Sequence, residues 1–433
     1  MRRFLPFIIL LIFQIPFMSH GQSDFIRIEN GQFILQDQPY YFLGTNFWYG
    51  MNLGSEGEGG DQQRLLRELD QLKELGVKNL RIMAASEGPD DEPWRMLPSL
   101  QPKAGKYNEE VLKGLDFLLA EMAKRDMYAV VCLNNFWPWS GGMAQYKAWT
   151  KKQNIPYPPP AEGGNWATYQ TYTADFYKND EAKSLFVDHI KFIVGRNNSI
   201  NGIAYVDDPH IMAWEIANEP RGILKPRKYR KWLKETASLI KKLDPNHLLT
   251  TGSEGYTPSK LAGTHAKKDH KSKHIDYLTV HIWIQNWGWY DPNDHEKTFP
   301  KAKEKALKYL NRHIEAAEEL GKPLVMEEFG IARDEDDHNP AATTAARDAY
   351  YQYMFEEVFN RAKAGSKLVG CNFWAWGGEG RPREPHAVWR SGDEFIGDPP
   401  HEYQGWYSVY DTDRTTLNVI ETYARKLEVL GKL

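Results

Sequence analysis

The sequence predicts an α/β protein built as a (β/α)8 TIM barrel, and three observations favour this fold class. Eight short runs of apolar, β-branched and aromatic residues recur along the chain, and amphipathic helical stretches separate most of them. The runs are continuous rather than alternating in polarity, which is typical of parallel strands buried on both faces. No glycine-rich phosphate-binding turn follows the first run, so an open nucleotide-binding sheet is disfavoured.

The chain begins with a segment typical of a signal peptide. Arg2 and Arg3 precede an apolar run over residues 4–17, which is too short to span a bilayer. Ser19 and Gly21 supply the small residues of a cleavage site. We therefore expect residues 1–21 to be removed and the protein to be secreted, either into the periplasm or outside the cell.

A β-hairpin is predicted ahead of the barrel. Residues 25–35 carry Asn30-Gly31 at their centre, which is a strong two-residue hairpin signal, and we expect this hairpin to plug the bottom of the barrel. Between the first two strands, Asp61 predicts the N-cap of a helix and Gly76 its end. The eight predicted strands are residues 41–48, 79–84, 128–135, 211–219, 248–253, 277–283, 324–329 and 368–376.

Two connections are unusually long. They are the first long loop, residues 136–179 after the third strand, and the second long loop, residues 377–406 after the eighth. Loops of more than about 15 residues inside a compact domain are usually functional, and in a barrel the loops that follow strands lie on the functional face. We expect residues 22–433 to form one domain, because no Pro/Gly/Ser-rich linker interrupts them.

The composition restricts the classes of partner. A net charge of −4 and a pI near 6.4 predict no nucleic-acid or membrane partner. The 15 Trp and 23 Tyr residues suit stacking against sugar rings, although many could simply fill a large core. Cys132 and Cys371 lie inside apolar strand-like runs and are predicted to be buried thiols. We expect a monomer.

Polar side chains at the ends of otherwise apolar strands predict where chemistry occurs. In a barrel these ends converge on one cleft. Two facing carboxylates with an Arg, a His and an Asn are the components of glycosidic bond cleavage, which needs a proton donor and a nucleophile. No HExxH, CxxC or GxxxxGK[ST] string is present, so neither a metal nor a cofactor is expected. The residues concerned are Arg81, Asn134, Asn135, Asn218, Glu219, His281, Glu327 and Glu328.

Several longer strings surround these residues, namely GTNFWY (44–49), LRI (80–82), NNFWPWSGGMAQY (134–146), NGIAYVDDP (201–209), AWEIANEPR (213–221), EEFG (327–330) and NFWAWGG (372–378). With them, the sequence resembles glycoside hydrolase family 5, in its β-mannanase branch, over essentially the whole mature chain. The resemblance implies that residues 22–433 are a single glycoside hydrolase domain.

The resemblance implies a role for each residue that matches the family pattern. Glu219 is then the acid/base and Glu328 the nucleophile of a retaining mechanism. Asn218 would hold the 2-hydroxyl of the sugar, and Arg81 would keep Glu328 ionised. His281 would lie beside the acid/base.

Asn135 and four tryptophans complete the predicted substrate site. The family pattern makes Trp374 the floor on which the sugar stacks. Where the family commonly has a tyrosine hydrogen-bonded to the nucleophile, this chain has Trp283, whose indole N–H can donate but not accept. Trp137 and Trp139 lie in the first long loop, where they form a sugar platform or pack within the loop.

Two acidic segments have alternative interpretations. Strand alternation points Glu327 away from the side of its neighbour Glu328, which favours a structural role. Residues 334–338 could bind Ca²⁺, but a solvated acidic loop is the favoured interpretation.

The resemblance implies a hydrolase of β-1,4-mannosidic bonds in mannan, glucomannan, galactomannan or manno-oligosaccharides. The usual activity of the branch is that of a mannan endo-1,4-β-mannosidase. However, the strings at residues 139–146, 281–287 and 397–405 resemble an exo-acting subset that releases mannose from chain ends, so a β-mannosidase is the alternative mode of attack. A β-1,4-glucanase of the same superfamily and a non-catalytic sugar-binding barrel are the competing functions.

Overall fold

The structure is a computed structural model that describes residues 24–432. The predicted signal peptide, residues 1–21, lies outside the described residues. All eight predicted barrel strands are present, and the residues of each are buried. Their bounds are β4 Phe42–Asn46, β5 Asn79–Met83, β6 Tyr128–Cys132, β7 Ile211–Glu215, β8 Leu248–Thr250, β9 Leu278–Ile282, β10 Leu324–Phe329 and β11 Leu368–Phe373.

The eight strands form one parallel sheet that is nearly closed into a barrel. Its order is β8-β7-β6-β5-β4-β11-β10-β9, so the seam lies between β8 and β9. Hydrogen bonds cross this seam: the Asp276 backbone N–H donates to Leu249 O at 2.8 Å, and Thr279 Oγ1 donates to Ser253 O at 2.6 Å. The predicted (β/α)8 fold class is therefore confirmed.

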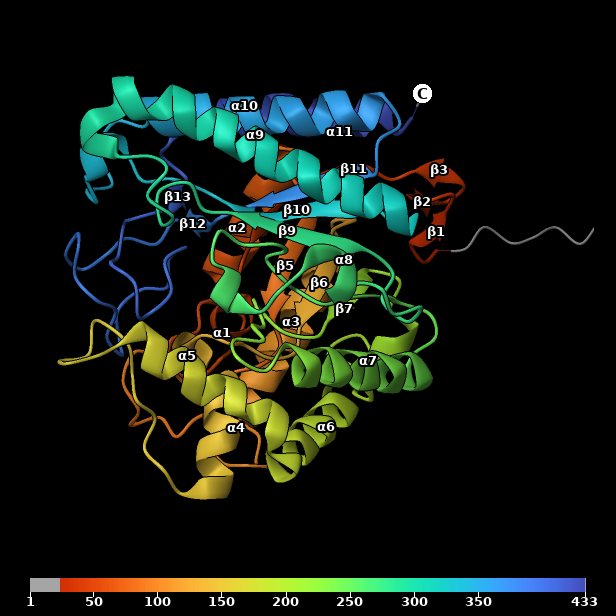
Figure 1. The fold of residues 1–433 in the computed structure, drawn as a ribbon, viewed down its shortest axis with the longest axis vertical. Helices are drawn as coiled ribbons and strands as arrows, with labels where there is room; N and C mark the ends of the chain where they lie inside the picture. The colour runs from red at the N-terminus through yellow and green to blue at the C-terminus, as the bar shows by residue number, and fades with distance from the viewer. Residues whose placement is uncertain (1–23, 433) are drawn as a thin grey trace, which may run out of the picture.

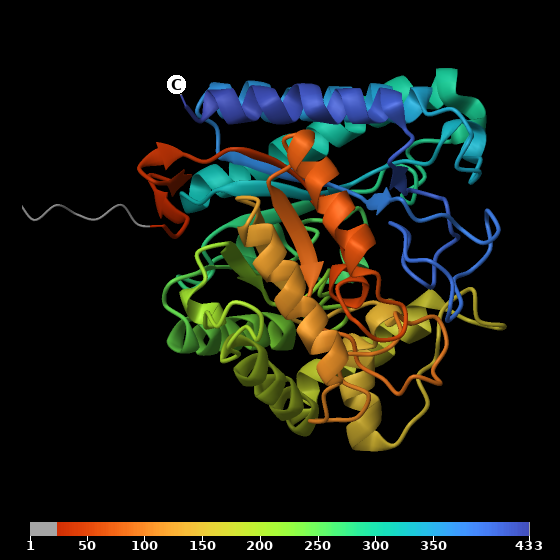
Figure 2. The same ribbon diagram turned by 180° about the vertical axis from the view of Figure 1, so that it is seen from behind.

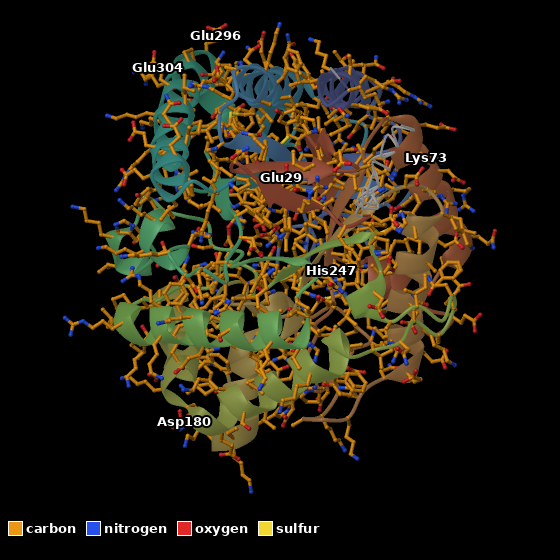
Figure 3. All side chains as sticks on the ribbon, turned by 90° about the vertical axis from the view of Figure 1, so that its right-hand side faces the viewer. Glu29, Lys73, Asp180, His247, Glu296 and Glu304 are labelled. Carbon is orange, nitrogen blue, oxygen red and sulfur yellow. The ribbon has the colours of Figure 1, made fainter. Side chains whose placement is uncertain are left out.

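Helices follow the strands and cover the outside of the sheet (Figure 1). The predicted N-cap is present, since the Asp61 carboxylate accepts a hydrogen bond from Arg64 N at 2.9 Å. Exposed charged residues such as Lys73 and Glu304 lie on the outer surface of the helices (Figure 3). The helices are α1 Gly50–Leu53, α2 Gln62–Glu74, α3 Glu109–Ala123, α4 Gly142–Lys151, α5 Trp166–Ala174, α6 Asp180–Val194, α7 Pro226–Leu243, α8 Ala266–Asp269, α9 His295–Leu320, α10 Ala345–Lys363 and α11 Arg414–Leu430.

An N-terminal antiparallel sheet covers one end of the barrel. Strands β1 Arg27–Glu29 and β2 Gln32–Leu35 are joined at Asn30 and Gly31, which both have positive φ, as a two-residue hairpin turn requires. The short β3 Gln38–Pro39 pairs with β2. The Phe33 ring packs edge-on against Tyr277 at 5.3 Å and belongs to an apolar cluster with residues of the barrel strands. The predicted hairpin therefore plugs the barrel.

The two long loops lie at the end of the barrel opposite this hairpin, as the two views show (Figures 1 and 2). The first long loop is largely helical, because it contains α4 and α5. The second long loop begins in β12 Trp376–Gly378, which pairs with β13 Val409–Tyr410 beyond its end. Both predicted cysteines are buried free thiols. None of the helices in residues 24–432 is both long and apolar enough to cross a membrane.

Candidate active site

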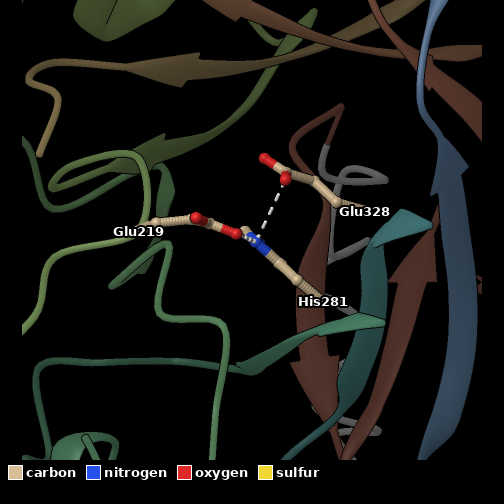
Figure 4. A group of neighbouring side chains, drawn as sticks. All are labelled: Glu219, His281 and Glu328. Carbon is tan, nitrogen blue, oxygen red and sulfur yellow. Dashed lines mark hydrogen bonds and ion pairs between the residues drawn. The ribbon is translucent and has the colours of Figure 1, made fainter. Parts of the chain in front are cut away.

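Two buried glutamates face each other at the functional end of the barrel. Glu328 lies on β10, while Glu219 lies four residues beyond the end of β7, in a segment predicted as strand. Glu219 has a φ of 46°, a left-handed conformation that is costly for a residue other than glycine and that recurs at functional sites. An oxygen of each carboxylate and a ring nitrogen of His281 lie within 4.8 Å of one another (Figure 4).

Three N–H groups face the Glu219 carboxylate. His281 Nδ1 lies 2.6 Å from Oε1, Trp283 Nε1 donates to the same oxygen at 3.3 Å, and Trp137 Nε1 donates to Oε2 at 2.6 Å. Burial raises the pKa of Glu219, but the hydrogen bond and charge of His281, the charge of Arg221 and the Trp137 N–H outweigh it and lower that pKa to about 2. This arrangement stabilises the ionised form of Glu219.

The surroundings of His281 favour its doubly protonated form. Its Nδ1 also lies 3.2 Å from Glu328 Oε2, and its Nε2 lies 3.2 Å from Glu327 Oε2. Ionised carboxylates only accept hydrogen bonds, so a ring with carboxylates at both nitrogens donates from both. Burial lowers the pKa of His281, but the charge of Glu328 and the hydrogen bonds to the three glutamates raise it well above its usual value.

Arg81 connects the nucleophile candidate to the floor of the site. Its guanidinium pairs with Glu328 through Nη1 and holds Glu215 by two hydrogen bonds of 2.6 and 2.8 Å. It also donates to Asn218 Oδ1 at 2.8 Å and to Asn46 Oδ1 at 3.0 Å. The Arg81 side chain is 5% exposed, so its charge acts at low screening on these groups.

Glu327 does not point away from the site. Pairing between β10 and β9 shifts register between Met326 and Glu328, so strand alternation is interrupted there. As a result Glu327 Oε2 reaches His281, and it lies 3.7 Å from Nε of Arg81. The expectation from simple alternation is therefore wrong at this position.

A cavity of about 540 Å³ opens over the two glutamates. It contains most of the predicted site residues, namely Trp137, Trp139, Asn218, Glu219, Trp283, Glu328 and Trp374. Three predicted residues, Arg81, His281 and Asn135, lie behind this lining. Asn135 donates to Ser140 Oγ at 3.0 Å and accepts from Asn218 Nδ2 at 3.0 Å, so its amide holds the neighbouring Asn218 rather than facing the cavity.

The four predicted tryptophans all line the cavity, but their contacts differ. Trp283 donates to Glu219 rather than to the nucleophile candidate Glu328, which is where the tyrosine of the family pattern would bond. Trp139 is 2% exposed and packs edge-on against Trp48 at 5.6 Å, so part of its role is loop packing. Trp137 instead lies beneath the guanidinium of Arg221, 4.7 Å from ring centre to carbon.

Several residues of the cavity were not predicted. Arg221 pairs with Glu254 through two hydrogen bonds of 2.5 and 2.9 Å. Its position directly after the Asn-Glu-Pro string could have indicated it as a site residue. The loop residues have no regular spacing that could have indicated them. The unpredicted lining consists of Pro159, Pro160, Trp166, Gln170, Arg221, Glu254, Asn286, Trp287, His401, Glu402, Tyr403 and Trp406.

The groups that could be metal ligands have other partners. Asp334 accepts from the backbone N–H groups of Ala345 and Ala346 at the start of α10, so it caps a helix. The spacing of Glu219, His281 and Glu328 would suit an ion, but Glu328 faces Arg81 and both nitrogens of His281 face carboxylates, so these groups act as hydrogen-bond partners.

Comparison with known proteins identifies a family. A family model described as GH family 5 beta-mannosidase-like matches residues 23–432. A glycoside hydrolase family 5 mannosidase from Rhizomucor miehei is 42% identical with a TM-score of 0.88, over 95% of this chain and 99% of that one. A mutant of that mannosidase has been solved in complex with mannosyl-fructose.

Two further relatives carry the name of an endo-acting enzyme. A putative mannan endo-1,4-beta-mannosidase 9 from Oryza sativa subsp. japonica is 31% identical over 369 residues, which are 82% of this chain and 82% of that protein. An endo-1,4-beta-mannanase from Rhizomucor miehei shares the fold, at 23% identity and a TM-score of 0.68 over 94% of this chain and 100% of that one.

Proposed function

This chain belongs to the beta-mannosidase-like group of glycoside hydrolase family 5, and we propose that it releases mannose units one at a time from the ends of β-1,4-linked manno-oligosaccharides and mannans. It is a glycosidase of β-mannosidic bonds. We further propose a retaining mechanism that uses Glu219 and Glu328, an exo mode of attack and export of the protein.

The spacing of the two carboxylates supports a retaining mechanism. Oxygens of Glu219 and Glu328 lie within 4.8 Å, close to the roughly 5 Å of retaining enzymes and short of the 6.5 to 9.5 Å needed to place a water between two carboxyl groups. Glu328 would attack the anomeric carbon while Glu219 protonates the leaving oxygen. Glu219 would then deprotonate the water that releases the sugar from Glu328.

The exo mode rests on one observation: the two long loops meet. The Trp166 ring of the first long loop packs edge-on against His401 of the second, with ring centres 6.0 Å apart. Trp166 also packs on Trp137 at 5.6 Å, so a row of rings runs from the acid/base candidate to the second loop. A long polymer crossing the cleft would have to pass this row, whereas a chain end would not.

Glu402 adds a polar group next to the last ring of this row, His401. It lines the cavity from the second long loop, and its Oε2 has no hydrogen-bond partner among residues 24–432. Burial and the negative charges of Asp398, Glu328 and Glu219 raise the pKa of Glu402 well above its usual value. Such a carboxyl group can bond the hydroxyls of a terminal sugar, which a continuing chain would not present. The cavity volume of about 540 Å³ also falls in the range of small-ligand sites.

Product analysis tests the proposal. Mannohexaose, galactomannan and carboxymethylcellulose are incubated in parallel, with chromatography of products and viscosity of the polymers. We expect mannose as the first product and galactomannan viscosity almost unchanged. Early loss of viscosity with mixed oligosaccharides would make the enzyme an endo-mannanase, and hydrolysis of carboxymethylcellulose alone would make it a glucanase.

We also propose that the protein is exported. The motivation is the positively charged start at Arg2 and Arg3, the apolar run and the small residues before position 22. N-terminal sequencing of protein recovered from a secreting host should begin at Gln22. A protein that keeps Met1 and stays in the cytosol would contradict this.

A further inference from the structure

We propose that Glu327 is a positioning residue that keeps His281 doubly protonated, so that His281 can supply a proton to Glu219 during the reaction. No contact of Glu327 with the cavity is needed for this role, since it acts through the histidine ring. The inference rests on the proposed function for its catalytic meaning, but the protonation state of His281 can be measured without any substrate.

The geometry places Glu327 at the far nitrogen of the ring. The register shift between β10 and β9 turns the side chains of consecutive residues 327 and 328 toward the same histidine. Glu327 Oε2 lies 3.2 Å from Nε2, while Nδ1 faces Glu219 at 2.6 Å and Glu328 at 3.2 Å. Glu327 is 1% exposed and its Oε1 has no hydrogen-bond partner among the described residues, so its carboxyl group is shielded from solvent.

A structural role alone does not account for this arrangement. A buried carboxylate with one free oxygen is costly unless a cation offsets it. The nearest cation besides His281 is Arg81, whose Nε is 3.7 Å away and already donates to Glu215. A doubly protonated His281 supplies the offset, and Glu327 in turn favours that state.

The other titratable groups around His281 have partners of their own. On the β8 side of the ring, the backbone oxygen of Glu254 accepts a hydrogen bond from the His281 backbone N–H at 3.3 Å. The carboxylate of Glu254 pairs with Arg221 instead. His313 of α9 has its Nδ1 on Tyr309 O, and burial lowers its pKa to about 3, so it is a neutral neighbour. Besides Glu219 and Glu328, which take part in the reaction, Glu327 is therefore the carboxylate that holds the ring.

The proton balance closes over one turnover. In the first step, the proton on His281 Nδ1 moves to Glu219 Oε1 and on to the leaving sugar oxygen, as Glu328 forms its bond to the anomeric carbon and the glycosidic bond breaks. In the second step, Glu219 takes a proton from the attacking water and returns it to Nδ1, while the bond to Glu328 breaks. Throughout both steps, His281 Nε2 keeps its own proton and donates it in a hydrogen bond to Glu327.

The first test measures His281 directly. Protein labelled with ¹⁵N-histidine is titrated by NMR, and His281 is assigned from a His281→Gln variant. We expect both ring nitrogens of wild-type His281 to be protonated at pH 7. In Glu327→Gln, which keeps the shape and removes the charge, the midpoint should fall by about one to three pH units. A singly protonated wild-type ring at pH 7, or an unchanged midpoint in Glu327→Gln, would overturn the proposal, and the wild-type result stands even if the variant does not fold.

The second test uses the pH profile of kcat/KM on an aryl β-mannoside. In Glu327→Gln the alkaline limb should move to lower pH, because the His281–Glu219 pair loses its shared proton earlier. Glu327→Asp, which keeps the charge and changes the shape, should keep the limb nearer to wild type even if kcat falls. A loss of kcat without a shift in Glu327→Gln would indicate a merely structural role. Absence of mannosidase activity in the wild type would refute the proposed function and leave the NMR result intact.

Discussion

His281 Nδ1 lies 2.6 Å from Glu219 Oε1, and Trp137 Nε1 lies at the same distance from the other oxygen of that carboxylate. A general acid must carry a proton, yet both oxygens of this one accept hydrogen bonds from N–H groups. These contacts therefore favour an ionised Glu219 beside a protonated His281. The pH dependence of activity should therefore respond to each donor that faces Glu219.

Trp137→Phe should move the alkaline limb of the kcat/KM profile to higher pH by up to about one unit. The Trp137 N–H lowers the pKa of Glu219, so its removal raises the proton affinity of that carboxylate. The proton needed for cleavage is then retained to higher pH. Phenylalanine keeps an aromatic ring beneath Arg221, which limits the loss of packing.

The matched control is Trp139→Phe. Trp139 also lines the cavity but makes no hydrogen bond to Glu219, so its substitution should leave the alkaline limb in place. Equal shifts in both variants would show that the effect comes from reshaping the cavity and not from the lost donor.

Glu328→Ala should reduce hydrolysis by about 10⁴-fold or more while the protein stays folded. Without this carboxylate no glycosyl-enzyme bond can form, although Arg81 keeps its two hydrogen bonds to Glu215. Azide added to an activated aryl mannoside should occupy the vacated space and give a glycosyl azide of inverted configuration. Circular dichroism checks the fold, and wild-type turnover in this variant would refute the assignment.

The fold could be predicted from the sequence because its signals are local and repeated. Each barrel strand is a continuous apolar run, and the hairpin turn depends on two adjacent residues, Asn30 and Gly31. Strand ends were less accurate: β7 stops at Glu215, although apolar character continues to Ala217. Beyond that point the chain follows contacts at the functional end of the barrel, such as the Glu219 N–H to Gly252 O bond, that are not encoded locally.

The site was predictable where polar residues interrupt apolar strands, as at Arg81 and His281. It was not predictable where tertiary contacts decide the outcome. The side on which Glu327 lies depends on a register shift between two strands far apart in the chain. The contact between Trp166 and His401 joins residues more than 200 positions apart, and no spacing in either loop indicates it.

Dialysis against EDTA should leave activity unchanged. The candidate ligand atoms of Glu219, His281 and Glu328 already oppose one another as donors and acceptors, and the mechanism needs a proton and a nucleophile. The measurement is kcat/KM before and after dialysis, with Ca²⁺ and Zn²⁺ added back separately. A loss that Ca²⁺ restores would assign a metal role to residues 334–338, and a loss that Zn²⁺ restores would assign it to the catalytic group.

Opening the contact between the two long loops should change the mode of attack. In the double variant Trp166→Ala/His401→Ala, the row of rings that continues from Trp137 ends early, so we expect a mannan chain to extend past Glu219 and Glu328. We expect mannobiose and longer products from mannohexaose, together with a faster fall of galactomannan viscosity per bond cleaved.

Phe192→Ala is the control for this double variant. Phe192 is 37% exposed, close to the 38% of Trp166, but it lies on α6 against Tyr107 and does not line the cavity. Mannose should remain the product of that control. The double variant could also release only mannose and lower galactomannan viscosity no faster than wild type. In that case the Trp166–His401 contact is not what limits attack to chain ends, and other residues must block the cleft.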